Sequence, residues 1–257
     1  MRLTDSTVKI DVVTLLPEMW SALDYGVIAR ARRRKLWQLR LWQLRDFSAR
    51  ADRRVDDRPY GGGPGMILGT QPLHACLQAV RAQCQNQPWV VQLDPSGRTL
   101  TQADFHALSL RKNLILVCGR YEGFDQRFTA QHVDECVSVG PYVLSGGDIP
   151  AMLLIDGLVR LIPGVLGNTE SPIQDSFTTN CLDYPNFTRP VEHDGLAVPE
   201  VLRSGNQRAI AAWRRMHALG KTWLSAPHLL RGQTLSAEDV ELLNTFLRAQ
   251  QYRKHTD

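Results

Sequence analysis

The sequence is short of features that mark several large classes of protein. Its five cysteines are odd in number, widely spaced and without a Cys-x-x-Cys pair, so they predict neither a disulfide framework nor a zinc site. No apolar run approaches the roughly 18 residues of a membrane-spanning helix, and the first residues lack the continuous apolar core of a signal peptide. We therefore expect reduced thiols, no membrane partner and a cytoplasmic location.

Two common nucleotide-binding motifs are also missing. Neither the P-loop pattern Gly-x-x-x-x-Gly-Lys-Ser/Thr nor the dinucleotide pattern Gly-x-Gly-x-x-Gly occurs, and each is needed by the class of protein named for it. Leu144 to Gly147 reads Leu-Ser-Gly-Gly, as in the signature of transporter ATPases. Without a P-loop that signature does not indicate an ATPase.

Positive charge is in modest excess, with a formal net charge of +4, and it is concentrated in one run. Such a run binds a phosphate backbone in some proteins and is an ordinary solvated helix end in others. Both interpretations remain open at this point. The run consists of Arg30, Arg32, Arg33, Arg34 and Lys35.

What the sequence does contain is an alternation of strand-like and helix-like segments. At 43% hydrophobic and 22% charged residues, the composition is that of a globular protein. Short apolar runs predict strands, and apolar residues at helical spacing predict helices between them. This alternation predicts a mostly parallel sheet covered by helices. The predicted strands are 9–16, 89–93, 114–118 and 136–139; the predicted helices are 18–22, 71–83, 102–111, 124–131 and 152–161.

Residues 36–45 are a perfect tandem duplication, Leu-Trp-Gln-Leu-Arg twice. Side chains alternate between the two faces of a strand, and five is an odd number. If the segment is a strand, each residue type therefore occurs once on each face. Two copies are too short to predict a solenoid.

The last third of the chain has a different character. Residues 167–175 are polar and rich in turn formers, which predicts an interdomain linker. Beyond it, residues 206–219 and 237–250 have helical apolar spacing and no strand-like segments follow. We expect an α/β domain over 1–166, a mobile linker over 167–177 and a small helical domain over 178–257.

Three glycine-containing loops are candidates for a ligand site. They span Pro59 to Met66, Gly119 to Gly123, and Leu144 to Asp148, and the second and third each follow a predicted strand. In open α/β sheets ligands bind at the carboxyl ends of strands, where glycines allow close approach of the backbone. Tight turns with no ligand would give the same spacing. By itself, Asp175 in its polar segment is typical of a turn or a helix N-cap.

Several longer runs, in order along nearly the whole chain, resemble the bacterial tRNA (guanine-N1)-methyltransferases of the TrmD family. They include Leu16 to Met19, Asp24 to Val27, Leu219 to Trp223 and the three glycine-containing loops. They also include Asp56 to Tyr60, Ile162 to Gly167, Asp175 to Phe177, Thr188 to Pro190 and Ser204 to Asn206.

The resemblance implies a fold that periodicity does not reveal. It implies a SPOUT-type α/β fold, a parallel sheet with a deep trefoil knot at its carboxyl edge, followed by the small helical domain. Knots are nearly absent among folds in general, so this expectation depends on the family alone. The resemblance also implies an obligate homodimer whose two active sites are shared between the chains.

The resemblance further implies that S-adenosylmethionine, the methyl donor, binds among the loops at that edge. Backbone groups of glycine-containing loops are suited to hydrogen-bonding an adenine and a ribose. The residues implied as cofactor contacts are Leu93, Pro95, Gly119, Tyr121, Glu122, Gly123, Val139, Gly140, Pro141, Tyr142, Val143, Leu144, Gly146 and Gly147.

For catalysis, the resemblance implies methylation of N1 of guanosine 37 in the anticodon arm of tRNA, with no DNA partner. N1 carries a proton that must leave before it attacks a methyl group, so a general base is required. Asp175 occupies the family's base position, and Arg160 occupies the position that stabilises charge on O6. The resemblance assigns no metal ligand and leaves a divalent metal requirement open.

Four positions depart from the residues usual in the family. Gln92 replaces a frequent tyrosine, Pro141 an acid, and Asn186 and Gln207 replace histidines. These departures bear on cofactor affinity and RNA contacts rather than on the reaction class. Two alternatives remain, another knotted RNA methyltransferase such as a ribose methylase, and a non-catalytic RNA-binding relative. Asp175 disfavours the ribose methylase, which would not need a base there.

Overall fold

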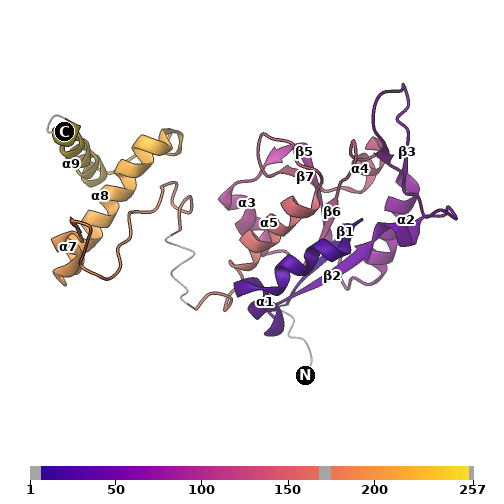
Figure 1. Ribbon diagram of the computed structural model, residues 1–257, viewed down its shortest axis with the longest axis horizontal. Coiled ribbons are helices and arrows are strands. Elements are labelled where there is room, and N and C mark those ends of the chain that lie inside the picture. The colour runs from indigo at the N-terminus through magenta and orange to yellow at the C-terminus, as the bar shows by residue number, and fades with distance from the viewer. Residues whose placement is uncertain (1–6, 168–174, 255–257) are drawn as a thin grey trace. The chain divides into compact units, whose positions relative to one another are not determined.

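The chain forms two compact units, residues 1–169 and 170–257, and each is described by itself. A computed structural model describes residues 7–167 and 175–254, with side chains described as far as residue 250 (Figure 1). Most of the linker predicted over 167–177 lies outside the described residues. Within them, none of the helices is both long enough and apolar enough to cross a membrane.

The first unit is built on a parallel sheet of five strands in the order β2-β1-β6-β5-β7. The central strands β1 and β6 are almost wholly buried, as expected when helices cover both faces of a parallel sheet. This confirms the predicted α/β class. The strands are β1 (Val8–Thr14), β2 (Trp37–Gln43), β5 (Trp89–Thr99), β6 (Asn113–Cys118) and β7 (Glu135–Ser138).

Helices cover the sheet on both faces and enclose two apolar clusters. On one face, α1 (Gly26–Arg33), α3 (Gln102–Ser109) and α5 (Asp148–Val159) contribute to the first cluster (Figure 1). On the other, α2 (Thr70–Ala82) and α4 (Gln126–His132) contribute to the second. Short elements complete the unit: the 3-10 helices Pro17–Asp24 and Leu44–Phe47, and a hairpin of β3 (Asp56–Asp57) and β4 (Ile67–Leu68).

The duplicated segment forms strand β2 and uses its two copies on opposite faces. Trp37 is fully buried in the first cluster, where its indole N–H donates to the carbonyl of Ile28 at 2.9 Å. Trp42 packs against the second cluster and donates to Asp11 at 2.7 Å. The prediction that each residue type occurs once on each face is confirmed for tryptophan.

Two expectations about helices in this unit are wrong in detail. Helix α1 was not predicted, although it carries the arginines at 30, 32 and 33 near its end. Helix α5 begins at Asp148 rather than Met152. Pro150 lies in the first turn of α5, where its missing N–H removes no helical hydrogen bond.

The second unit is mainly helical. It consists of α7 (Glu200–Arg203), α8 (Gln207–Ser225), a 3-10 turn (Pro227–Leu229) and α9 (Ala237–Lys254). The prediction that strands disappear here is wrong, because β8 (Glu192–His193) pairs with β9 (Leu196–Ala197). Asp194 and Gly195, with φ of 49° and 76°, form the turn of this hairpin. Asp-Gly is a typical hairpin turn, so the signal was present in the sequence.

Candidate active site

The loops that follow β6 and β7 surround a cavity of about 320 Å³, together with the middle of β5, where its pairing with β7 changes register. This volume lies within the usual range of small-molecule sites. Its walls are formed by Leu93, Asp94, Pro95, Gly119, Arg120, Tyr121, Glu122, Gly123, Phe124, Val137, Ser138, Val139, Tyr142, Val143, Leu144, Gly146, Gly147 and Pro150.

Most of the residues expected to contact a cofactor line this one cavity. The exceptions are Gly140 and Pro141. Gly140 is buried in a turn, where its N–H donates to the Ser138 hydroxyl at 3.2 Å and its carbonyl accepts from the same hydroxyl at 2.9 Å. Asp94 and Arg120 were not among the expected cofactor contacts, and they contribute charged groups to the cavity walls.

Close contact between two loops explains why one of these positions is a glycine. The N–H of Gly147 donates to the carbonyl of Gly119 at 2.8 Å. A Cβ added at Gly147 would lie 2.8 Å from the backbone nitrogen of Gly119 and 2.9 Å from Cα of Cys118. Neither neighbour can move aside as a flexible side chain would, so any larger residue separates the two loops.

A buried ion pair fastens the same two loops to the core. Asp148, only 1% exposed, opens α5 and accepts from Arg120 Nε at 3.0 Å and Nη2 at 2.8 Å. Thr14 and the indole of Trp20 also donate to Asp148. Arg120 in turn donates to the carbonyl of Ser145 at 3.3 Å. The charge of Asp148 is therefore compensated by donors from three separate segments, as a buried carboxylate requires.

The first glycine-containing loop connects β3 to β4 and reaches the cavity through β4. Leu68 of β4 donates its N–H to the carbonyl of Gly123 at 2.9 Å, and Asp125 donates to the carbonyl of Leu68 at 3.0 Å. Glu122 donates its N–H to the carbonyl of Met66 at 2.9 Å. The loop Gly119 to Gly123 is thus hydrogen-bonded to the end of the first glycine-containing loop and to β4.

The two candidate catalytic residues lie in different units. Arg160 is the half-buried C-cap residue of α5 in the first unit. Asp175 is half-buried in the second unit, and its carbonyl accepts the N–H of Thr178 at 3.2 Å. Asp175 therefore occupies a turn, as expected for an aspartate in a polar segment. Neither residue lines the cavity of the first unit.

The structure shows where the four residues that depart from the family pattern lie. The side chain of Gln92 is directed at α4 and β7, accepting from Thr129 at 2.8 Å, and it does not line the cavity. Pro141 is exposed. Asn186 contacts Asp183 and the carbonyl of Tyr184, and Gln207 begins α8.

The thiols near the cavity are unsuited to nucleophilic catalysis. Burial raises the pKa of the Cys118 thiol well above its usual value, and the pKa of Cys136 is raised by burial to about 11. A thiol is nucleophilic only as the thiolate. In the part of the chain that the structure describes, no group of three or more metal-ligating side chains forms a metal centre.

The fold and the cavity define a class, α/β proteins that bind a small ligand at the carboxyl edge of a parallel sheet. Residues 8–232 match the family model described as tRNA (Guanine-1)-methyltransferase TrmD. The chain belongs to this family.

Curated relatives agree over almost the whole length. The tRNA (guanine-N(1)-)-methyltransferase of Chromobacterium violaceum is 48% identical over 251 residues, covering 96% of this chain and 98% of that protein. The protein of the same name from Salmonella newport is 48% identical over 249 residues, with coverage of 96% and 98%. The family expected from the sequence is confirmed.

Proposed function

We propose that Asp175 is the general base of an enzyme that methylates N1 of guanosine 37 in tRNA. The reaction class follows from family membership: the chain is a tRNA (guanine-N1)-methyltransferase that uses S-adenosylmethionine. The cavity of the first unit supports the cofactor part of the proposal, since twelve of the fourteen expected cofactor contacts line it. The role of Asp175 rests on its position in a run that resembles the family's. Because its substrate is tRNA, we place the enzyme in the cytoplasm.

The residues around the cavity fit S-adenosylmethionine. Leu93, Val137 and Leu144 provide apolar surface for an adenine. The carboxylates of Asp94 and Glu122 suit ribose hydroxyls and a positively charged ligand. When bound, S-adenosylmethionine would supply an electrophilic methyl group, and the sulfur–methyl bond would break to leave neutral S-adenosylhomocysteine.

The residues of the chain then have two tasks. Asp175 accepts the proton of guanine N1, which leaves a lone pair on the nitrogen that attacks the methyl carbon. Arg160 stabilises the negative charge that develops on O6 as the proton departs. The helical second unit and the basic surfaces hold the anticodon arm. No step in this scheme needs a metal ion.

We also propose the knotted topology of the family for the first unit. The contact between Gly119 and Gly147 supports it, because loops after two different strands pass within hydrogen-bonding distance. Close passage of this kind is needed wherever a chain is threaded tightly.

A homodimer with shared active sites is the third part of the proposal. Apart from Asp156, the residues of helix α5 after its first turn are apolar or small, which is typical of a helix that is covered on most sides. Nevertheless Ile149 and Leu153 are 50% and 47% exposed, and the preceding Val143 is 81% exposed. A second copy of the chain is the covering partner that the family implies. Leu153→Asp is expected to yield monomers in sedimentation, with wild-type protein as dimers.

Methyl transfer from labelled S-adenosylmethionine to tRNA transcripts tests the reaction. Transcripts carrying guanosine or adenosine at position 37 are compared, and label is expected only with guanosine, recovered as 1-methylguanosine. Equal labelling of both transcripts would assign the enzyme to another position, including a ribose. Cofactor binding without any labelling would support the non-catalytic alternative.

A further inference from the structure

A second groove, of about 810 Å³, adjoins the cofactor cavity in the first unit. The two share Phe124 as a wall residue. The groove lies among the segment 50–60, β4, the start of α2 and the start of α4. Four arginines line it: Arg50, Arg54, Arg58 and Arg127.

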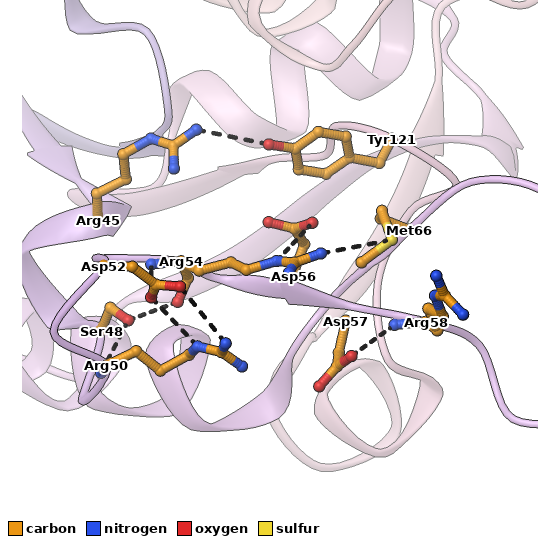
Figure 2. Close-up of polar contacts among 10 residues, drawn as sticks. All are labelled: Arg45, Ser48, Arg50, Asp52, Arg54, Asp56, Asp57, Arg58, Met66 and Tyr121. Atoms are coloured by element: carbon orange, nitrogen blue, oxygen red, sulfur yellow. Dashed lines mark hydrogen bonds and ion pairs between the residues drawn. The ribbon is translucent and has the colours of Figure 1, made fainter.

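The loop before β3, which carries Arg50 and Arg54, is held by its own hydrogen bonds. Ser48 donates to the carbonyl of Arg54, and the N–H of Arg54 donates to Asp52 at 3.1 Å (Figure 2). Beyond the loop, the N–H of Gly69 donates to the carbonyl of Val55 at 2.9 Å. The guanidinium groups are therefore attached to an ordered backbone, which lowers the entropic cost of ligand binding.

Two of the arginines are available to an anionic ligand. Arg58 makes no side-chain hydrogen bond or ion pair with the described residues; the bond in Figure 2 joins its backbone N–H to Asp57. Arg54 lies 3.6 Å from Asp56 and 3.8 Å from the sulfur of Met66, and its side chain is 43% exposed. The Asp56 side chain is only 10% exposed, so Arg54 compensates a largely buried carboxylate, while the outward part of its guanidinium still has N–H donors for a phosphate.

The acidic residues of the groove are mostly engaged with the backbone. Four arginines and three aspartates, at 56, 57 and 125, leave a net charge of +1 on its walls. Asp57 accepts the N–H of Arg58 at 2.8 Å, and Asp125 accepts the N–H of Arg127 at 2.9 Å. Asp125 also holds the guanidinium of Arg127 at 2.7 Å. Among the described residues that line the groove, Arg58 is therefore the arginine without an ion pair, and Arg54 has only its 3.6 Å pair with Asp56.

The N-terminus of α2 adds favourable electrostatics. This 13-residue helix begins after Gly69, has no side-chain cap and has no acidic residue in its first turn. Residues 69–72 line the groove. The unbonded N–H groups of a helix N-terminus and its partial positive charge attract anions.

We infer that this groove binds the phosphodiester backbone of the substrate tRNA, beside the nucleotide that enters the cofactor cavity. The inference rests on the proposed function, which makes RNA the anionic ligand. Because Phe124 lines both, the groove lies next to the proposed cofactor cavity. Arg45 also reaches the cavity wall residue Tyr121 at 3.5 Å (Figure 2). Guanidinium groups are well matched to phosphate oxygens.

The test compares Arg54→Gln, Arg58→Gln and the double variant with Arg53→Gln as control. Arg53 belongs to the same loop, is 60% exposed and pairs with Asp46, but it does not line the groove. The affinity for unmodified tRNA is measured at several KCl concentrations, and S-adenosylmethionine binding is measured by calorimetry.

Each groove variant is expected to bind tRNA roughly tenfold more weakly, since a hydrogen bond to a charged group is lost. The slope of log affinity against log salt should fall in magnitude by roughly 0.7–0.9 for each arginine removed. Cofactor binding should be unchanged. Affinities and slopes equal to those of Arg53→Gln would overturn the inference, as would a parallel loss of cofactor binding. Binding is measured without turnover, so failure of the proposed reaction would show separately, in the wild-type protein.

Discussion

The two units of the chain differ in the size and composition of their hydrophobic cores. The first unit has two extensive clusters around a parallel sheet, and it buries the charged Asp11 and Asp148 with their partners. The second has one small cluster, centred on Cys181, Leu219, Leu230 and Leu243. The first can therefore fix several loops around one cavity, whereas the second presents short surface elements.

The comparison suggests a division of function. The residues proposed to bind the cofactor are concentrated in the first unit, and the proposed general base belongs to the second. If this division is correct, substitutions in the first unit should affect cofactor binding, and Asp175 should affect turnover alone. The following predictions test the division, from the largest expected effect to the smallest.

Asp175→Asn should reduce kcat by about 10²- to 10⁴-fold, the usual contribution of a general base. S-adenosylmethionine affinity should be unchanged, because Asp175 is not part of the cavity. Single-turnover methylation and calorimetry measure the two effects. Asp194→Asn, at an 86% exposed side chain in the β8–β9 turn, is the control. A wild-type rate in Asp175→Asn would remove this residue from the mechanism.

Asp148→Asn should lower the free energy of unfolding of the first unit by about 3–5 kcal/mol, as expected when one partner of a buried ion pair is removed. It should also weaken cofactor binding, because Arg120 would no longer hold the two loops. Hydrogen exchange resolved by unit, together with calorimetry, measures both effects. Asp156→Asn, at an exposed position on the same helix, is the control. Unchanged exchange would show that the ion pair does not fasten the loops.

Gly147→Ala should weaken S-adenosylmethionine binding by about 1–3 kcal/mol, the typical effect of overpacking. The added methyl group forces the backbone at Cys118 and Gly119 away from the loop that contains Gly147. Gly167→Ala is the control, because nothing lies within 4 Å of its added Cβ. If both variants bind the cofactor equally, the contact between the loops is not needed for the cavity.

In the second unit, Asp239→Asn should abolish a small dependence of stability on acid pH. The hydrogen bond from Arg215 is the main cause that lowers the pKa of Asp239 in the folded state. The contribution of the Asp239 carboxylate to the free energy of unfolding is therefore complete above the unfolded-state pKa of about 3.9. It is lost as pH falls through the lower pKa of the folded state.

Arg215 is 36% exposed, so solvent screening limits the contribution of this pair to under about 1 kcal/mol. Urea unfolding of wild-type and variant protein between pH 6 and roughly pH 2 measures it. Equal stability of the two proteins at every pH would mean that the pair contributes nothing. A loss of cofactor binding in Asp239→Asn would contradict the division between the units.

Much of the fold was determined by sequence patterns that act locally. The apolar runs at 114–118 and 136–139 form β6 and β7, because side-chain burial on both faces of a parallel strand requires such runs. The odd five-residue period of the duplication placed Trp37 and Trp42 on opposite faces of β2. The glycine-containing loops and the family's runs indicated most of the cavity wall.

What the sequence left undecided depended on contacts between distant segments. Asp148 follows two glycines and has no local sign of its partners, since Thr14, Trp20 and Arg120 reach it only after the sheet has formed. Arg58 was part of a family run, yet its place in a groove at the start of α2 was set by the β3–β4 hairpin. Periodicity describes which face of an element is buried, whereas compensation of a buried charge and the shape of a groove depend on packing in three dimensions.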